Sequence, residues 1–192
     1  MKPGNPHKND RTRYDGPEIG EYANPVLSYP SRGGTLKAFQ DYYPDNLSHC
    51  YGCGRLNERG LHIRTFWDGE ESVTRFTPSP HHTAVPGFVA GGILASLIDC
   101  HGTGTAAAAA YRAEDRAMDT PPMHRFVTAS LRVDYLKPTP IGVELVVRGR
   151  VKEIRGRKVV VEATVSAGGE ATVRGEVVAV EIPETMRPGA SA

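Results

Sequence analysis

Hydrophobic and polar residues alternate in six segments of the chain, and this period of two predicts β-strands. The segments 61–67 and 72–77 are joined by Asp68-Gly69, which indicates a tight turn between neighbouring strands. Four further segments lie at 127–135, 143–151, 159–165 and 171–182. Gly149 indicates a bulge or bend within its segment. The pattern predicts mainly antiparallel strands joined by hairpins.

One segment between the two groups of strands favours a helix. It runs from Gly91 to about Arg112 without proline and is rich in alanine and leucine. At about 100° per residue, small and polar residues share one stripe: Gly92, Ala95, Asp99, Thr103 and Ala106. Bulkier residues lie roughly opposite: Leu94, Leu97 and His101. The helix therefore has one core face and one face of small residues.

Two features of this helix need an explanation beyond helix propensity. Its glycines each cost about 1 kcal/mol relative to alanine, so we expect a neighbouring backbone or a ligand to approach closely there. Asp99 is a carboxylate in an apolar helix, and burying it unpaired is costly, so it is a candidate functional residue. The alternative is an aspartate that is capped by a neighbour or partly solvated.

The predicted fold is α+β: a curved antiparallel sheet of about five or six strands wrapped around one long helix, about 91–112. Residues 46–183 form this domain. Residues 1–45 are an extension that is ordered in part at most, with a short helix near 36–43. The extension is either disordered or lies across a neighbouring subunit, and residues 184–192 are a flexible tail.

Composition excludes several function classes. The formal net charge is +1, so no nucleic acid and no anionic membrane surface is expected as a partner. The N-terminal residues contain no apolar core of a signal peptide, and no segment is apolar enough to span a bilayer, so we expect a soluble, cytoplasmic protein. Three cysteines, an odd number, do not indicate a secreted disulfide framework.

The pair Cys50-x-x-Cys53, flanked by His49 and His62, is compatible with a zinc site or a redox motif. A zinc ribbon needs a second ligand pair, and the remaining cysteine, Cys100, lies within the predicted helix. We therefore expect small packed residues in a turn and no metal. His81 and His82 lie in the loop that leads to the helix and are weaker candidates for a site.

Several motifs, taken together and in order, resemble those of the hotdog-fold acyl-CoA thioesterases of the phenylacetate-pathway and hydroxybenzoyl-CoA thioesterase type. The resemblance covers about residues 47–183. The matching residues fall in three groups: Cys50, Cys53, Gly54, Asn57, Gly60 and Leu61; Gly87, Gly91, Gly92 and Asp99; and Thr128, Leu131, Tyr135, Leu136, Lys137 and Pro138.

The resemblance implies hydrolysis of an acyl-CoA thioester. The Gly91 backbone amide, with Gly92 beside it, polarises the thioester carbonyl. Asp99 acts as general base or nucleophile, with Thr103 as its partner one turn further along. The family usually has histidine where this chain has Ala90. The residues expected to contact substrate are His82, Gly87, Ala90 and Thr128, with Lys137, Arg155 and Arg157 near the phosphates of coenzyme A. No cofactor is expected beyond the coenzyme A of the substrate.

Gly91 and Asp99 are eight residues apart, about 12 Å along one helix, which is too far to serve one carbonyl. The family resolves this with a site shared between subunits, so the resemblance implies a homodimer or a dimer of dimers. The alternative function is a non-catalytic hotdog module that binds acyl-CoA or a small apolar ligand. A hydratase would need Asp99 and His101 on one face of the helix. The acyl chain, the pathway and the choice between dimer and tetramer stay open.

Overall fold

The computed structural model describes residues 37–183 and 186. The predictions for residues 1–36 and for the tail at 184–192, except Met186, therefore fall on residues outside this described part. The strands are β1 (Thr65–Asp68), β2 (Glu71–Phe76), β3 (Phe126–Tyr135), β4 (Leu145–Arg155), β5 (Lys158–Ala167) and β6 (Glu170–Glu181). One α-helix, α1 (Gly91–Ala113), follows β2, and the short 3₁₀ helices are η1 (Phe39–Tyr42), η2 (Asp45–Leu47) and η3 (Pro80–His82).

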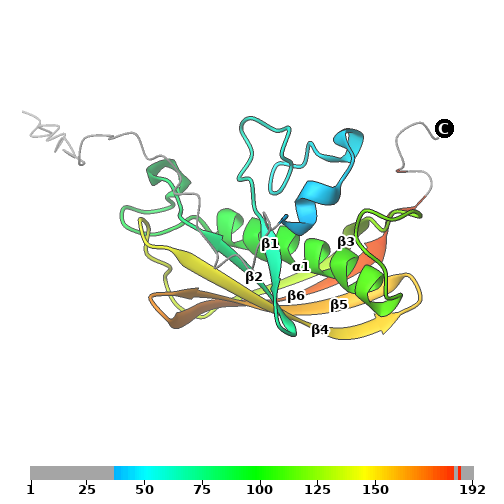
Figure 1. Ribbon diagram of the computed structural model, residues 1–192. Helices are drawn as coiled ribbons and strands as arrows, with labels where there is room; N and C mark the ends of the chain where they lie inside the picture. The colour runs from blue at the N-terminus through cyan, green and yellow to red at the C-terminus, as the bar shows by residue number, and fades with distance from the viewer. Residues whose placement is uncertain (1–36, 184–185, 187–192) are drawn as a thin grey trace, which may run out of the picture.

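The six strands form one antiparallel sheet in the order β1-β2-β4-β5-β6-β3. The sheet curves beneath α1, which lies across its inner face (Figure 1). The predicted architecture, a curved sheet around one long helix, is confirmed. None of the helices in the described part of the chain, α1 included, combines the length and the apolar composition that crossing a membrane requires. Among the strands that the structure describes, the outermost two, β1 and β3, each pair with one neighbour only.

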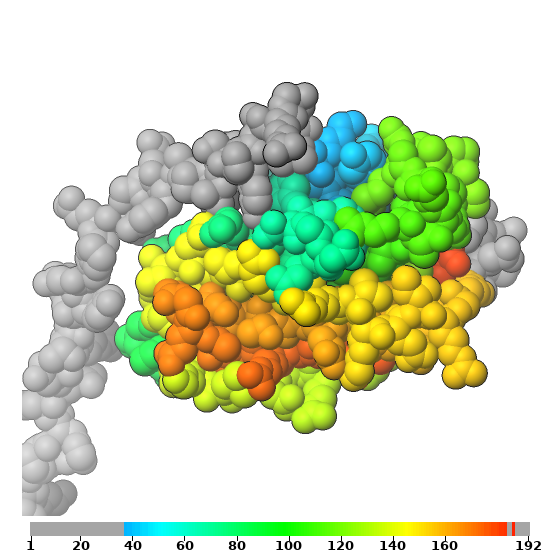
Figure 2. Space-filling view, turned by 60° about the horizontal axis from the view of Figure 1, so that its bottom comes forward, coloured from blue at the N-terminus to red at the C-terminus, as the bar shows by residue number. Residues whose placement is uncertain are grey.

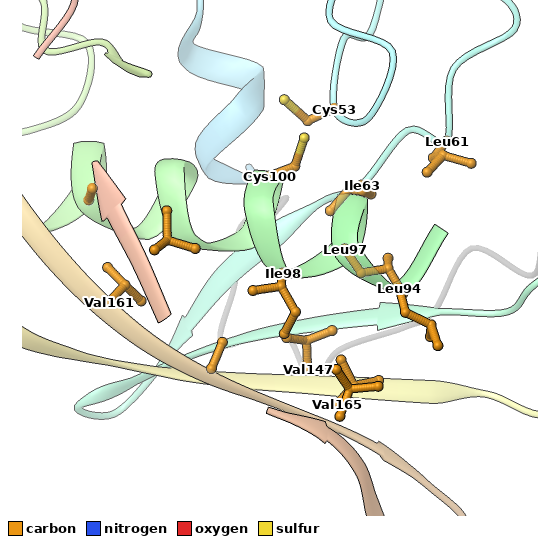
Figure 3. Close-up of a cluster of buried hydrophobic side chains, with 14 of the residues drawn as sticks. Cys53, Leu61, Ile63, Leu94, Leu97, Ile98, Cys100, Val147, Val161 and Val165 are labelled. Atoms are coloured by element: carbon orange, nitrogen blue, oxygen red, sulfur yellow. The ribbon is translucent and has the colours of Figure 1, made fainter. Parts of the chain in front are cut away.

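The core lies between α1 and the sheet. Leu97 and Ile98 on the helix are fully buried against inward-facing valines of the central strands, as the close-up shows for Val147, Val161 and Val165 (Figure 3). Such burial stabilises the fold by about 1.5–3 kcal/mol for each large aliphatic side chain. The helix can approach the sheet this closely because Gly102 has no Cβ. An added Cβ there would lie 2.5 Å from a methyl carbon of Val177.

A second layer covers the opposite side of α1. The segment from η1 through the loop at 48–64 crosses the helix on the side away from the sheet (Figure 1). Phe39 and Gln40 in η1 are buried, and the Gln40 amide bonds to Thr65 at the start of β1. The short helix predicted near 36–43 is thus a 3₁₀ helix that packs on the domain. The helix α1 is enclosed between the sheet and this loop layer.

The first predicted strand is shorter than expected. Residues 61–64 are not part of the sheet, because the backbone amides of Leu61 and Ile63 donate to the carbonyls of Tyr51 and Gly52 instead. Their side chains are still buried, which explains the alternating pattern. The other five strands begin and end within a few residues of their predicted positions.

Gly149 is not at a bulge. It pairs in register with Ser72 and Ala163, and the irregularity of β4 lies between Val151 and Glu153. The glycine is needed for space, since a Cβ at this position would lie 2.4 Å from a ring nitrogen of His101.

The outer face of the sheet is polar. Figure 2 looks toward β4 and β5 from the side away from α1, and no described helix covers them there. Arg148 and Arg150 form ion pairs with Glu71, and Lys152 pairs with Glu162 and Glu176 across the strands. These pairs are largely exposed and add little stability each, but they keep this face solvated.

Candidate active site

Asp99 lies on the side of α1 that faces β3. Its side chain is half-buried, and one carboxylate oxygen accepts a hydrogen bond from the hydroxyl of Thr128 on β3. The other oxygen lies 4.0 Å from the thiol of Cys100. Burial raises the pKa of Asp99, and the bond from Thr128 opposes this shift in part. A partly desolvated carboxylate with one hydroxyl partner is a stronger base than a solvated one.

The N-terminus of α1 presents backbone donors. Ala90 caps the helix with extended backbone (ψ 135°), and its carbonyl accepts from the amides of Ile93 and Leu94. Within the part of the chain that the structure describes, the amides of Gly91 and Gly92 have no hydrogen-bond acceptor. Unpaired N–H groups at a helix N-terminus, together with the helix dipole, stabilise negative charge.

Gly91 also lines a cavity of about 560 Å³. The cavity wall is mainly apolar. It is formed by the loop before α1, the first turn of α1, the end of β3 and the segment after it: Val85, Phe88, Val89, Leu94, Tyr135, Leu136, Lys137, Pro138 and Thr139. The hydroxyl of Tyr135 donates to the Gly91 carbonyl at 2.8 Å. Asp99 does not line this cavity. Within one chain, the amide donor and the carboxylate therefore belong to different places along the helix.

The remaining predicted site residues near the helix have identifiable structural contacts. The hydroxyl of Thr103 donates to the backbone carbonyl of Asp99 at 3.1 Å, not to its carboxylate. His82 accepts a hydrogen bond from the Ser79 amide at its Nδ1 (3.0 Å). The His82 carbonyl accepts from the Ala90 amide at 2.8 Å, which fixes the start of the helix. Gly87 has a positive φ of 91° in the loop before the cap. Their roles in catalysis or binding stay predictions.

The three predicted cations do not converge in one chain. Lys137 lines the cavity beside Gly91 and pairs with Glu170. Arg155 and Arg157 lie at the turn between β4 and β5, where Arg157 bonds to the backbone of Glu181 at the other end of the sheet. Within a single chain, Arg155 and Arg157 therefore lie too far from Lys137 for all three to contact the phosphates of one coenzyme A bound beside Gly91.

Sequence reasoning missed two groups at the cavity. Tyr135 belongs to the motif that resembles the family, but the residue pattern does not predict its hydrogen bond to the Gly91 carbonyl. Thr139 is 2% exposed, lines the cavity, and its hydroxyl has no hydrogen-bond partner among the described residues. Buried hydroxyl groups without a hydrogen-bond partner are uncommon in folded proteins, so this group is notable beside the cavity.

Comparison with known proteins identifies the family. The family model described as Thioesterase superfamily matches residues 86–174. A Thioesterase superfamily protein from Shewanella loihica PV-4 is 48% identical, with 73% of this chain and 100% of that chain covered and a TM-score of 0.56. Acyl-coenzyme A thioesterase THEM4 of Mus musculus is 35% identical over 125 residues, which cover 64% of this chain and 48% of that protein.

The chain spans about half the length of the curated relatives it matches. The E. coli PaaI protein from the phenylacetic acid degradation operon has a TM-score of 0.52 at 16% identity, over 64% of this chain and 81% of that chain, which supports the fold alone. The hotdog fold implied by the sequence motifs is confirmed. By its fold, its family match and its similarity to a whole related chain, this protein belongs to the thioesterase superfamily.

Proposed function

We propose that this protein hydrolyses an acyl-CoA thioester to a free acid and coenzyme A. The observation that carries the proposal is the half-buried Asp99 carboxylate on a helix whose first two amides have no acceptor among the described residues. The curated relatives named acyl-coenzyme A thioesterase support the substrate class. The cavity beside Gly91, about 560 Å³ with a mainly apolar wall, suits an acyl group.

In the proposed reaction, the thioester oxygen accepts a hydrogen bond from the Gly91 amide, which stabilises the negative charge that develops there. Asp99 either removes a proton from water, which attacks the carbonyl carbon, or attacks that carbon itself. The carbon–sulfur bond then breaks and coenzyme A leaves as a thiolate. In the second route, water hydrolyses the resulting anhydride and restores Asp99. A thiolate is a good leaving group, so no strong general acid is required.

The proposed site combines Gly91 of one chain with Asp99 of another. The outer edge of β3, which no other described strand pairs with, supports this arrangement, because Thr128 near the start of β3 contacts Asp99 and Tyr135 at its end contacts Gly91. Two copies paired antiparallel along β3 about a twofold axis would place the Gly91 end of each chain beside the Asp99 end of the other. The dimer would then hold two equivalent sites.

The direct test is thiol release from aryl-, short-chain and long-chain acyl-CoAs, followed with a sulfhydryl reagent. Asp99→Asn keeps the shape of the side chain and should reduce turnover by about 100- to 10,000-fold. Retained turnover in a folded Asp99→Asn protein would contradict the role of the carboxylate. Binding without turnover in the wild-type protein would favour the non-catalytic ligand-binding module, for which Ala90 in place of the family's histidine is the motivating feature.

The amide donor can be removed without removing the helix. Proline is tolerated at the first helical position, and the extended backbone of Ala90 suits a residue before proline. Gly91→Pro removes the N–H and should reduce turnover by about 100- to 1,000-fold. The matched control, Gly91→Ala, adds a Cβ 3.2 Å from the exposed Tyr135 hydroxyl but keeps the N–H, so it should retain most activity. Equal losses in both variants would indicate a steric effect.

Mixing the two inactive variants tests whether the site is shared. After subunit exchange between equal amounts of Asp99→Asn and Gly91→Pro, about half of the dimers are heterodimers, and one of the two shared sites in each heterodimer is intact. About a quarter of the wild-type activity should therefore return. If each chain carried its own complete site, mixing would restore nothing.

A further inference from the structure

Three cysteines that are far apart in the sequence meet beside Asp99. The Sγ atoms of Cys50, Cys53 and Cys100 all lie within 4.8 Å of one another, and those of Cys50 and Cys100 are 3.8 Å apart. All three are free thiols; Cys53 and Cys100 are buried and Cys50 is half-buried. Figure 3 shows Cys53 on the loop above the helix and Cys100 pointing toward it from α1. The sequence argument against a metal, that Cys100 lies elsewhere in the helix, therefore fails in three dimensions.

The loop holds Cys50 and Cys53 in a fixed turn. The Gly54 amide donates to the Cys50 carbonyl at 2.8 Å, and the backbone of 61–63 pairs with Tyr51 and Gly52. A Cβ on Gly52 would lie 2.2 Å from the Cys100 sulfur, so only glycine allows Cys100 to sit over the turn. The three sulfurs are thus positioned by backbone geometry before any ligand arrives.

Their spacing fits a tetrahedral thiolate site. A zinc–sulfur bond of about 2.3 Å places neighbouring sulfurs of a tetrahedron about 3.8 Å apart. The Cys50–Cys100 separation equals this value, and the other pairs need to contract by at most about 1 Å, which the turn carrying Cys53 can supply. Soft thiolates select zinc and similar thiophilic ions over magnesium or calcium, which prefer oxygen ligands.

One carboxylate oxygen lies beside the cluster, next to the Cys100 sulfur. Asp99 Oδ2 lies 4.0 Å from the Cys100 sulfur, and carboxylate oxygens also bind zinc. Two further side chains, those of Arg125 and Tyr43, lie near the three sulfurs. The Arg125 guanidinium lies 4.2 Å from the centre of the Tyr43 ring, in electrostatic range of all three cysteine sulfurs. The buried Tyr43 hydroxyl has no hydrogen-bond partner among the described residues and lies in electrostatic range of the same sulfurs.

We propose that Cys50, Cys53 and Cys100 bind one Zn²⁺ ion as thiolates, with the carboxylate of Asp99 as the fourth ligand. Each thiol releases its proton to solvent on binding. Arg125 offsets part of the negative charge of the site. The consequence is that zinc occupies the proposed catalytic carboxylate and inhibits hydrolysis. This consequence rests on the proposed function, whereas the metal site itself does not.

The test uses the reduced full-length protein without an affinity tag, first treated with a chelator and then titrated with Zn²⁺ or Co²⁺. We expect one ion bound per chain, a sulfur-to-cobalt charge-transfer absorption, and a zinc-dependent rise in unfolding temperature. Cys50→Ser, at the half-buried position, should weaken binding by at least about 10-fold and remove most of the charge-transfer band. His49→Ala is the matched control: this exposed neighbour is outside the cluster, so metal binding should be unchanged.

Several outcomes would overturn the proposal. They are a folded, reduced wild-type protein that binds no stoichiometric metal, a Cys50→Ser variant that binds as tightly as wild type, and equal weakening by His49→Ala. Because Cys variants can misfold, the zinc-dependent unfolding shift of the wild-type protein is a separate measurement, and its absence also counts against the site.

Thiol release measured with and without zinc separates the two parts of the proposal. Loss of turnover with zinc, reversed by chelator, supports coordination by Asp99. One bound ion with unchanged turnover would retain the thiolate site and contradict the carboxylate as its ligand. A wild-type protein that is inactive toward every acyl-CoA but binds one ion would contradict the proposed function alone.

Discussion

His101 lies in the middle of α1, fully buried, and both nitrogens of its ring are hydrogen-bonded to hydroxyls on β2. Nε2 pairs with Ser72 and Nδ1 with Thr74, each at 2.9 Å. Burial lowers the pKa of His101 to about 3, so the ring is neutral. A neutral imidazole has one donor and one acceptor, and the two hydroxyls satisfy both. This residue faces away from Asp99 and joins the helix to the sheet.

His101→Leu replaces the ring with a side chain of similar size, so lost hydrogen bonds dominate the effect on stability. Each of the two bonds contributes about 0.5–1.5 kcal/mol, and the abandoned hydroxyls add a desolvation cost. That cost is reduced because Ser72 keeps a bond from Thr105 (2.7 Å) and Thr74 keeps one with Thr65 (3.0 Å). We expect the free energy of unfolding to fall by about 2–4 kcal/mol in total. The unfolding temperature should fall by about 4–16 °C.

Urea unfolding of the wild type, His101→Leu, Thr74→Val and the double variant measures this directly. Thr74→Val removes one ring bond, so its effect should be about half that of His101→Leu, and the double variant should be non-additive by about 1 kcal/mol. Thiol release per folded molecule should change little. A His101→Leu protein as stable as wild type would refute the energetic argument. A stable but inactive variant would instead place His101 in the chemistry, as the hydratase alternative requires.

Two further predictions concern packing and pH. Gly102→Ala should lower the unfolding temperature, because the added Cβ would overlap Val177 at a net cost of about 1–3 kcal/mol in the free energy of unfolding. The control, Gly92→Ala, places its Cβ in open space and should leave stability unchanged or raise it. Equal effects of the two variants on the unfolding temperature would contradict close packing at Gly102. Burial, aided by the charge of His81, lowers the pKa of His82 below 6.5 in the folded protein. As the pH falls, the imidazole of residue 82 is therefore protonated in the unfolded chain at a higher pH than in the folded one. Stability should therefore decline as the pH falls below 6.5, less steeply in His82→Gln.

The sheet could be predicted from the sequence because its strands alternate between core and solvent over many residues. The prediction was wrong for residues 61–64, where the alternation of Leu61 and Ile63 reflects burial under a loop. Side-chain period reports which residues are buried, not which backbone partner accepts their hydrogen bonds. The same limit applies to Gly149. This glycine leaves space for the ring of His101 on α1, and that contact cannot be predicted from the sequence because the two residues are far apart in the chain.

The candidate site was predictable only where its groups lie on one element. Asp99 was identified because an acid among small residues stands out within a single helix. The cysteine cluster was missed because Cys50 and Cys100 are brought together by the loop crossing above α1, a contact that no local pattern encodes. The positions of Arg155 and Lys137 at opposite ends of the sheet likewise depend on strand order.

The geometry of α1 explains why these features are coupled. Consecutive helical residues are about 100° apart, so four of them face nearly every direction around the helix. Ile98 packs on β6, Asp99 bonds to β3, Cys100 meets the loop, and His101 bonds to β2. A helix that contacts a different neighbour through each of these residues cannot shift to suit one neighbour without disturbing the others. Substitutions at these four positions should therefore combine non-additively in stability, even where their chemical roles differ.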